Sequence, residues 1–90
     1  MGVNKYKIIF SKQAKKDASK IEKSYLKESV LKLICILQEN PFGQPPSFEK
    51  LKGDLLNFYS RRINKQHRLV YEVIESKKIV RVLRMWTHYE

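Results

Sequence analysis

Short stretches of this chain alternate between apolar and polar residues, which is the pattern of half-buried β-strands. The first is Lys5–Phe10 and the last is Lys78–Trp86. Between them, Asn57–Ile74 predicts two strands joined by a polar loop at Asn64–His67, and β-branched and aromatic residues are frequent in both strands. These segments together predict four β-strands.

Two other segments carry apolar residues at the three- and four-residue spacing of amphipathic helices. Ser11 is a suitable N-cap for a helix that runs to Lys23, and Ser24 for a second helix over Tyr25–Glu39. Pro41 ends the second helix, because proline cannot continue it and disfavours helical backbone at the preceding residue. The apolar helix positions are Ala14, Ala18, Ile21, Leu26, Val30, Leu33, Ile34 and Leu37.

The segment between the second helix and the paired strands has little periodicity. Pro41–Pro46 predicts a loop and holds all three prolines, Ser47–Lys52 allows no assignment, and Gly53-Asp54 predicts a turn. The order of elements is therefore β-α-α-β-β-β, and two amphipathic helices can cover only one face of a small antiparallel sheet. We expect one α+β domain over residues 1–90, with the other sheet face open to solvent or to a ligand.

Charge is the feature of the composition that bears on function. An apolar content of 42% with 31% charged residues is ordinary for a globular protein, but 19 Lys and Arg against 9 Asp and Glu give a net charge of +10. Such an imbalance in a small folded domain indicates a polyanionic partner, with RNA or DNA first. No membrane association is expected, because the longest apolar run, Leu33–Leu37, is too short to span a bilayer.

Cysteine and histidine usage narrows the chemistry further. The single cysteine, Cys35, lies in the apolar run of the second helix, which predicts a buried and unreactive thiol. A lone thiol with no signal peptide before it is typical of a cytoplasmic protein. No cluster of cysteines and histidines occurs, so neither a metal site nor a cofactor is expected.

The paired strands carry three arginines, which alternation divides between the two faces. The core face of the second strand of the pair holds Leu69, Tyr71 and Val73. Arg68 therefore projects from the open face, where Arg62 lies with Ser60, whereas Arg61 faces the other way, where we expect a structural or supporting role. A single exposed arginine is most often simply solvated, but Arg62, Arg68 and the terminal His88 all come near strand ends. For His67, in the polar loop, we expect a structural or incidental role.

Cleavage of RNA without a metal requires three kinds of group. A base removes the proton of the 2′-hydroxyl, cations stabilise the charge at phosphorus, and an acid protonates the departing 5′-oxygen. The chain holds Glu49 in a loop before the sheet, Arg62 and Arg68 on the sheet and His88 at its end. These residue types occur together in most proteins, so they do not establish the activity by themselves.

Several motifs carry a resemblance to a known family. They are Pro41-Phe42, Phe48–Gly53, Ser60-Arg-Arg-Ile63, His67-Arg-Leu-Val-Tyr71 and His88-Tyr89. Together with the order of elements, they resemble the YoeB (Txe) group of RelE-type bacterial toxins over nearly the whole chain. The resemblance implies the toxin of a type II toxin-antitoxin system: a ribosome-dependent mRNA endonuclease, or mRNA interferase, that cuts the codon in the decoding site. Its partners would be the ribosome, mRNA and a cognate antitoxin with an acidic segment.

The resemblance also implies roles for individual residues. Glu49 would be the general base, Arg68 the transition-state clamp and His88 the general acid. The supporting RNA contacts would be Arg62, Lys52 and Tyr89. No metal or cofactor takes part in such a mechanism.

Two alternatives and one structural question stay open. The chain could be a non-catalytic basic RNA-binding module, or an inactive toxin relative that acts only in an antitoxin complex. The lysines of the first helix fit docking on ribosomal RNA or an ordinary solvated face; they are Lys12, Lys15, Lys16, Lys20 and Lys23. The sequence does not decide whether the free protein is a monomer or a homodimer.

Overall fold

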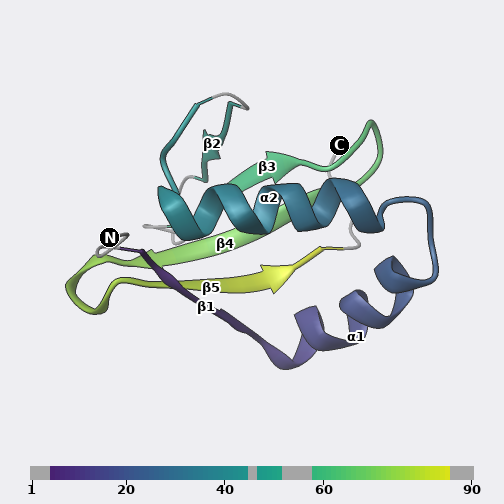
Figure 1. Cartoon of the computed structure of the whole chain (residues 1–90), viewed down its shortest axis with the longest axis horizontal. Coiled ribbons are helices and arrows are strands. Elements are labelled where there is room, and N and C mark those ends of the chain that lie inside the picture. Colours follow the sequence, from purple (N-terminus) through teal and green to yellow (C-terminus); the bar gives the residue numbers. More distant parts are fainter. Residues whose placement is uncertain (1–4, 45–46, 52–57, 86–90) are drawn as a thin grey trace.

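The computed structural model describes residues 5–44, 47–51 and 58–85. They form a five-stranded sheet with two helices, α1 and α2, on one face (Figure 1). In chain order the elements are β1 Lys7–Phe10, α1 Lys12–Glu22, α2 Lys27–Glu39, β2 Glu49–Lys50, β3 Phe58–Arg62, β4 Arg68–Ile74, the 3₁₀ turn η1 Glu75–Lys77, and β5 Ile79–Arg84. The α+β class and the helices on one face are confirmed.

The strand order in the sheet is β1-β5-β4-β3-β2. Neighbouring pairs from β2 to β5 are antiparallel, but β1 runs parallel to β5, with Lys7 opposite Ile79 and Phe10 opposite Val82. The sheet is mostly antiparallel, as expected, but it differs from the four antiparallel strands of the prediction in two respects. A fifth strand, β2, joins the edge, and the first strand pairs with the last. Alternation within a strand specifies neither its partner nor the direction of that partner.

Of the two serines expected to cap a helix, one does so and the other does not. Ser11 does cap α1, because its Oγ accepts a hydrogen bond from the Ala14 N–H at 3.0 Å and donates one to the Leu83 carbonyl. Ser24 does not begin α2; its Oγ donates to the Ile21 carbonyl and accepts from the Leu26 N–H, so it shapes the turn between the helices. Consequently α2 begins at Lys27, two residues later than predicted.

The core lies between the helices and one face of the sheet. Its sheet side includes Leu69, Tyr71 and Val73 of β4, as predicted from alternation, together with Val80 and Val82 of β5. Its helix side is made of Ala14, Ile21, Leu26, Val30, Leu33 and Leu37. In Figure 1, α2 lies along the middle strands and α1 follows β1. The helices do not cover the opposite face of the sheet.

Cys35 is exposed, so the prediction of a buried thiol is wrong. The buried face of α2 is marked by Leu33 and Leu37, and Cys35 is two residues from each. Two residues correspond to about 200° of rotation around an α-helix, so Cys35 points away from the core. The apolar run that contains it crosses both sides of the helix.

The last strand contains a β-bulge. Tyr71 pairs with Val82, but Val70 pairs with Arg84, so β5 accommodates one extra residue, Leu83, against β4. The bulge reverses the alternation of β5: Arg84 moves to the open face and Met85 becomes buried.

Asp17 of α1 secures the end of this strand. Its carboxylate is 1% exposed, and its Oδ2 accepts a hydrogen bond from the Met85 N–H at 2.9 Å. The Gln13 side-chain amide donates to the other oxygen. A buried carboxylate with such partners ties α1 to the chain where β5 has ended.

No helix in the described parts of the chain is both long enough and apolar enough to cross a membrane.

Candidate functional site

Strands β2, β3 and β4 bring four polar residues together on the open face. Glu49 pairs with Ser60 across β2 and β3, and Arg62 pairs with Arg68 across β3 and β4. Directly opposed residues of an antiparallel pair project from the same face and lie in contact range. Glu49 is therefore part of the sheet, and the prediction that it lies in a loop is wrong; a strand of two residues is too short to show alternation.

An ion pair joins two of the predicted site residues. The Nη1 atom of Arg68 donates to the Glu49 carboxylate at 2.8 Å and to the Ser60 hydroxyl at 3.2 Å. The Arg68 side chain is 18% exposed and that of Glu49 is 68% exposed. Ser60 is buried, so Arg68 is held from below while Glu49 remains accessible to solvent.

Around this ion pair is a small polar pocket of about 110 Å³. Its lining is Ser47, Phe48, Glu49, Ser60, Arg62 and Arg68. Arg62 is exposed, and within the described residues its guanidinium has no hydrogen-bond or ion-pair partner. Two arginines directly opposite each other repel, and an anion between them converts that repulsion into attraction. The pocket suits a phosphate group, which arginine binds with two parallel hydrogen bonds.

Arg61 lies on the other face of β3, as alternation predicted, and its side chain is buried. Its Nη2 donates to the carbonyls of Pro41 and Gly43 at 2.8 and 2.9 Å, and its Nε donates to the Tyr71 hydroxyl at 3.2 Å. The guanidinium also lies over the Phe48 ring, 5.2 Å from its centroid. Arg61 thus fixes the loop after α2 against the sheet, just before the chain enters β2.

Aromatic residues complete the support of β2. The Phe48 ring packs edge-to-face on Tyr59 and contacts Phe42, with centroids 5.8 Å apart in both cases. Burial raises the pKa of the Tyr71 hydroxyl, so this group stays protonated and donates to the Pro41 carbonyl at 2.9 Å. Because Phe48 directly precedes Glu49, this packing positions the carboxylate.

Three of the six predicted site residues lie within the described part of the chain and three do not. Glu49, Arg62 and Arg68 come together in the pocket. The other three are Lys52, His88 and Tyr89, which lie outside the described residues. His67 is buried just before β4, and its carbonyl accepts a hydrogen bond from the Ile63 N–H, which agrees with the structural or incidental role expected for it.

A further cation on the open face was not anticipated. Val80 and Val82 are core residues, and continued alternation would also put Arg84 in the core. The bulge puts it beside Val70 on the open face instead. The sequence holds one signal of this change, since the apolar Met85 follows Arg84 where a polar residue should stand.

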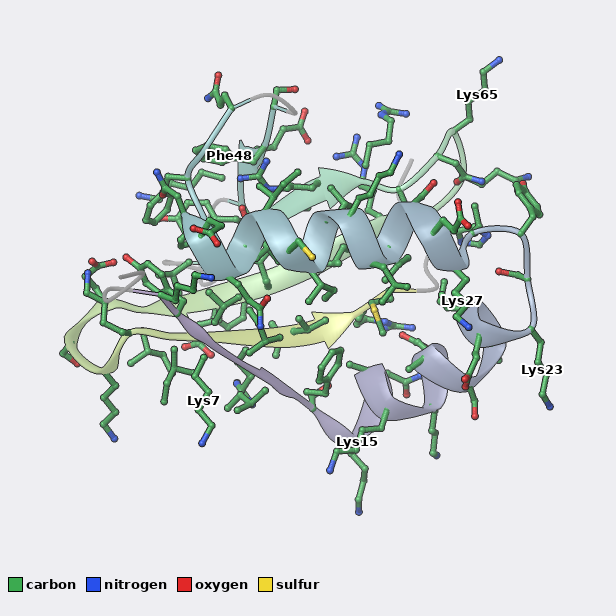
Figure 2. All side chains as sticks on the ribbon, in the orientation of Figure 1. Lys7, Lys15, Lys23, Lys27, Phe48 and Lys65 are labelled. Atoms are coloured by element: carbon green, nitrogen blue, oxygen red, sulfur yellow. The ribbon has the colours of Figure 1, made fainter. Side chains whose placement is uncertain are left out.

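Exposed lysines spread positive charge over the rest of the surface. In Figure 2, the labelled Lys15, Lys23 and Lys65 extend away from the ribbon into solvent. The lysines predicted for the first helix are all exposed; they are Lys12, Lys15, Lys16, Lys20 and Lys23. Their field attracts polyanions over a distance limited by salt screening.

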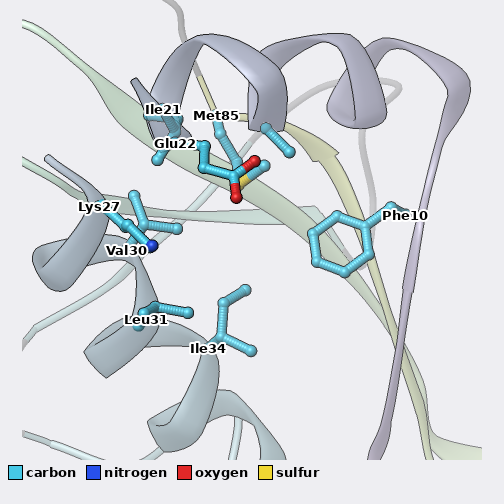
Figure 3. Close-up of a pocket in the computed structure, with 9 residues that line it drawn as sticks. Phe10, Ile21, Glu22, Lys27, Val30, Leu31, Ile34 and Met85 are labelled. Atoms are coloured by element: carbon cyan, nitrogen blue, oxygen red, sulfur yellow. The ribbon is translucent and has the colours of Figure 1, made fainter. Parts of the chain in front are cut away.

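A second pocket, between the two helices, is apolar. Figure 3 shows Phe10, Leu31, Ile34 and Met85 around a hollow whose volume is about 240 Å³. Glu22 and Lys27 are its ionisable lining residues. None of the predicted site residues lines it, so the candidate chemistry belongs to the polar pocket on the other face.

Comparison with known proteins identifies the family. Residues 9–89 match the family described as the YoeB-like toxin of bacterial type II toxin-antitoxin system. A relative, toxin YoeB of Streptomyces coelicolor, is 39% identical over 49 residues, which cover 54% of this chain and 58% of that protein. The matched region thus spans less than two thirds of the relative's length.

Solved structures agree with this result over most of the chain. A YoeB/ParE toxin from Agrobacterium tumefaciens superposes with a TM-score of 0.84 at 29% identity, covering 92% of this chain and 99% of that one. YoeB in a heterotetrameric complex with YefM from Staphylococcus aureus superposes with a TM-score of 0.79 at 31% identity, covering 93% and 98%. The chain therefore belongs to the YoeB-like toxins of bacterial type II toxin-antitoxin systems.

Proposed function

We propose that this toxin is a metal-independent endoribonuclease that cleaves mRNA in the decoding site of the ribosome. The observation that carries the proposal is the 2.8 Å ion pair between Arg68 and Glu49 in a polar pocket on the open sheet face. It joins a carboxylate that can accept a proton to a cation that can hold a phosphate. Membership of the YoeB-like toxins supports the same reaction.

In the proposed mechanism, the Glu49 carboxylate accepts the proton of a ribose 2′-hydroxyl. The 2′-oxygen attacks the adjacent phosphorus, and the bond from phosphorus to the 5′-oxygen breaks. His88 donates a proton to the departing 5′-oxygen, which leaves a 2′,3′-cyclic phosphate on one product and a 5′-hydroxyl on the other. Arg68 and Arg62 stabilise the negative charge that develops on the phosphoryl oxygens.

The arrangement of the free site explains how substrate would enter it. Because the Glu49 side chain is 68% exposed, water competes for its ion pair with Arg68, and a phosphate can displace the carboxylate at little cost. Ser60 keeps its hydrogen bond to Arg68 and holds the guanidinium in place during the exchange. Release from Arg68 leaves the carboxylate free to act as a base. Lys52 would add a contact to the phosphate, and Tyr89 would add a contact to the nucleobase.

The partners follow from charge. A protein of net charge +10 suits ribosomal RNA and mRNA, and the lysines of α1 offer a second region of phosphate contact. A cognate antitoxin with an acidic segment would neutralise the open face by covering Arg62 and Arg68. The complex of S. aureus YoeB with YefM supports an antitoxin partner. These proposed partners support a cytoplasmic location.

The test is a reconstituted translation reaction, with cleavage mapped by primer extension. Wild-type protein should cut at codons in the decoding site. Glu49→Gln should lower the rate about 10²–10⁴-fold, as expected for loss of a general base. Arg68→Ala should lower it about 10²–10³-fold, as expected for loss of a stabilising donor.

The sheet supplies a matched control. Arg81 of β5 and Glu72 of β4 form a comparable ion pair at 3.0 Å, outside the polar pocket. Glu72→Gln should cut like wild type. Wild-type protein that cuts no mRNA, or Glu49→Gln protein that cuts at full rate, would contradict the mechanism. Ribosome or RNA binding without any cleavage would favour a non-catalytic RNA-binding module.

A further inference from the structure

Arg84 lies on the open face of the sheet, although alternation along β5 would place it on the core face. The bulge in β5 sets it directly opposite Val70, so both side chains project from the open face. The same register sets Val70 opposite Ser60, and Ser60 opposite Glu49. One row of residues therefore crosses four strands, from Glu49 on β2 to Arg84 on β5.

This row connects Arg84 to the polar pocket. Adjacent strands are about 4.8 Å apart, so Arg84 lies one strand spacing from Val70 and two from Ser60. Arg68 is two residues from Val70 on β4 and shares its face, which makes Arg68 and Arg84 diagonal neighbours. Diagonal neighbours lie about 7–8 Å apart, within reach of long side chains.

The electrostatic state of Arg84 differs from that of a nearby arginine. Arg81 lies on the same strand and is neutralised by Glu72 at 3.0 Å. Arg84 is exposed, and within the described residues no hydrogen bond or ion pair engages its guanidinium. Val70 lies between Arg84 and Ser60. Its side chain is apolar and buried, so it does not bind an anion itself. The open face thus presents cations on both sides of Val70.

We propose that the RNA strand crosses the sheet from β2 toward β5, and that Arg84 binds a backbone phosphate beside the one held by Arg62 and Arg68. This inference rests on the proposed function for the identity of the ligand. A guanidinium matches the geometry of a phosphate and reads no base, so the contact is independent of sequence. Arg84 is a binding residue that aligns the strand and takes no part in proton transfer.

The test uses a short single-stranded RNA with 2′-O-methyl riboses, which cannot be cut. Its binding to the free protein is followed by fluorescence anisotropy over a series of salt concentrations. Arg84→Ala should weaken binding about three- to fivefold at low salt, as expected for one exposed ion pair. It should also reduce the slope of log affinity against log salt by about 0.7, the value for one phosphate contact on a single strand. Arg84→Lys should keep most of the slope.

Arg81→Ala is the matched control, because it removes a cation from the same strand that Glu72 already neutralises. It should leave the salt slope unchanged. In the translation assay, Arg84→Ala should raise KM and leave kcat near the wild-type value, which is the result of losing uniform substrate binding.

The outcomes separate this inference from the proposed function. An unchanged salt slope in Arg84→Ala, or an equal loss in Arg81→Ala, overturns the Arg84 contact even if the toxin cuts mRNA. A reduced slope in a toxin that cuts nothing supports the phosphate contact and overturns the proposed cleavage.

Discussion

The strongest single test of the architecture is replacement of Arg61 by alanine. The hydrogen bonds of the buried guanidinium include three to the carbonyls of Pro41 and Gly43 and to the Tyr71 hydroxyl. A hydrogen bond to a charged group contributes about 1.5–3 kcal/mol. At the low end of that range the three bonds together give a loss of about 4–5 kcal/mol. A small domain has only about 5–15 kcal/mol of stability, so most of the margin would disappear.

Urea unfolding followed by circular dichroism measures this loss. Arg62→Ala is the matched control, because Arg62 is the next residue, has the same side chain and points into solvent. It should change the free energy of unfolding by less than about 0.5 kcal/mol. A second variant, Tyr71→Phe, removes a hydroxyl that contacts both Arg61 and Pro41, and it should lower the free energy of unfolding by about 1–3 kcal/mol. This variant still tests the contact if Arg61→Ala does not fold.

The reasoning would be refuted by a small effect. If Arg61→Ala lost less than about 1 kcal/mol, or no more than Arg62→Ala, the buried guanidinium would not be what holds the loop.

Two further predictions concern groups away from the site. Hydrogen bonds from the Tyr6 hydroxyl and from Lys78 lower the pKa of the Glu75 carboxyl from its ordinary 4.5. The ionised carboxylate therefore stabilises the fold above pH 4.5, and this stabilisation is lost as the pH falls through the lowered pKa. Glu75→Gln should therefore flatten the acid side of a plot of urea midpoint against pH, and a fall as steep as in the wild type would contradict this. Cys35 should react with iodoacetamide in the folded protein nearly as fast as in urea, because it is exposed; strong protection on folding, seen by intact mass, would show that it is not.

The sequence predicted those features that depend on local periodicity. The paired strands and their faces followed from alternation, which correctly separated Arg61 from Arg62 and Arg68. The buried face of α2 followed from the spacing of Val30, Leu33 and Leu37. In each case neighbouring residues share one environment that repeats along the chain.

The features that were missed depend on partners distant in sequence. Glu49 lies in a strand of two residues, whose conformation comes from pairing with β3 and not from its own pattern. The exposure of Cys35 follows from rotation around α2, which a short apolar run does not reveal. Arg84 changes face through a bulge set by the register of β5 against β4.

The place of β5 in the sheet has a consequence for biosynthesis. β5 lies between β1 and β4 in the sheet. β1 is made first, but it cannot pair until β5, the last described strand, has been made. Such a pairing closes nearly the whole chain and is slow to form, because the entropy of loop closure is lost before the contact is made. During synthesis β1 therefore stays unpaired until β5 has been made, and we expect the docking of β1 on β5 to be a late step of folding.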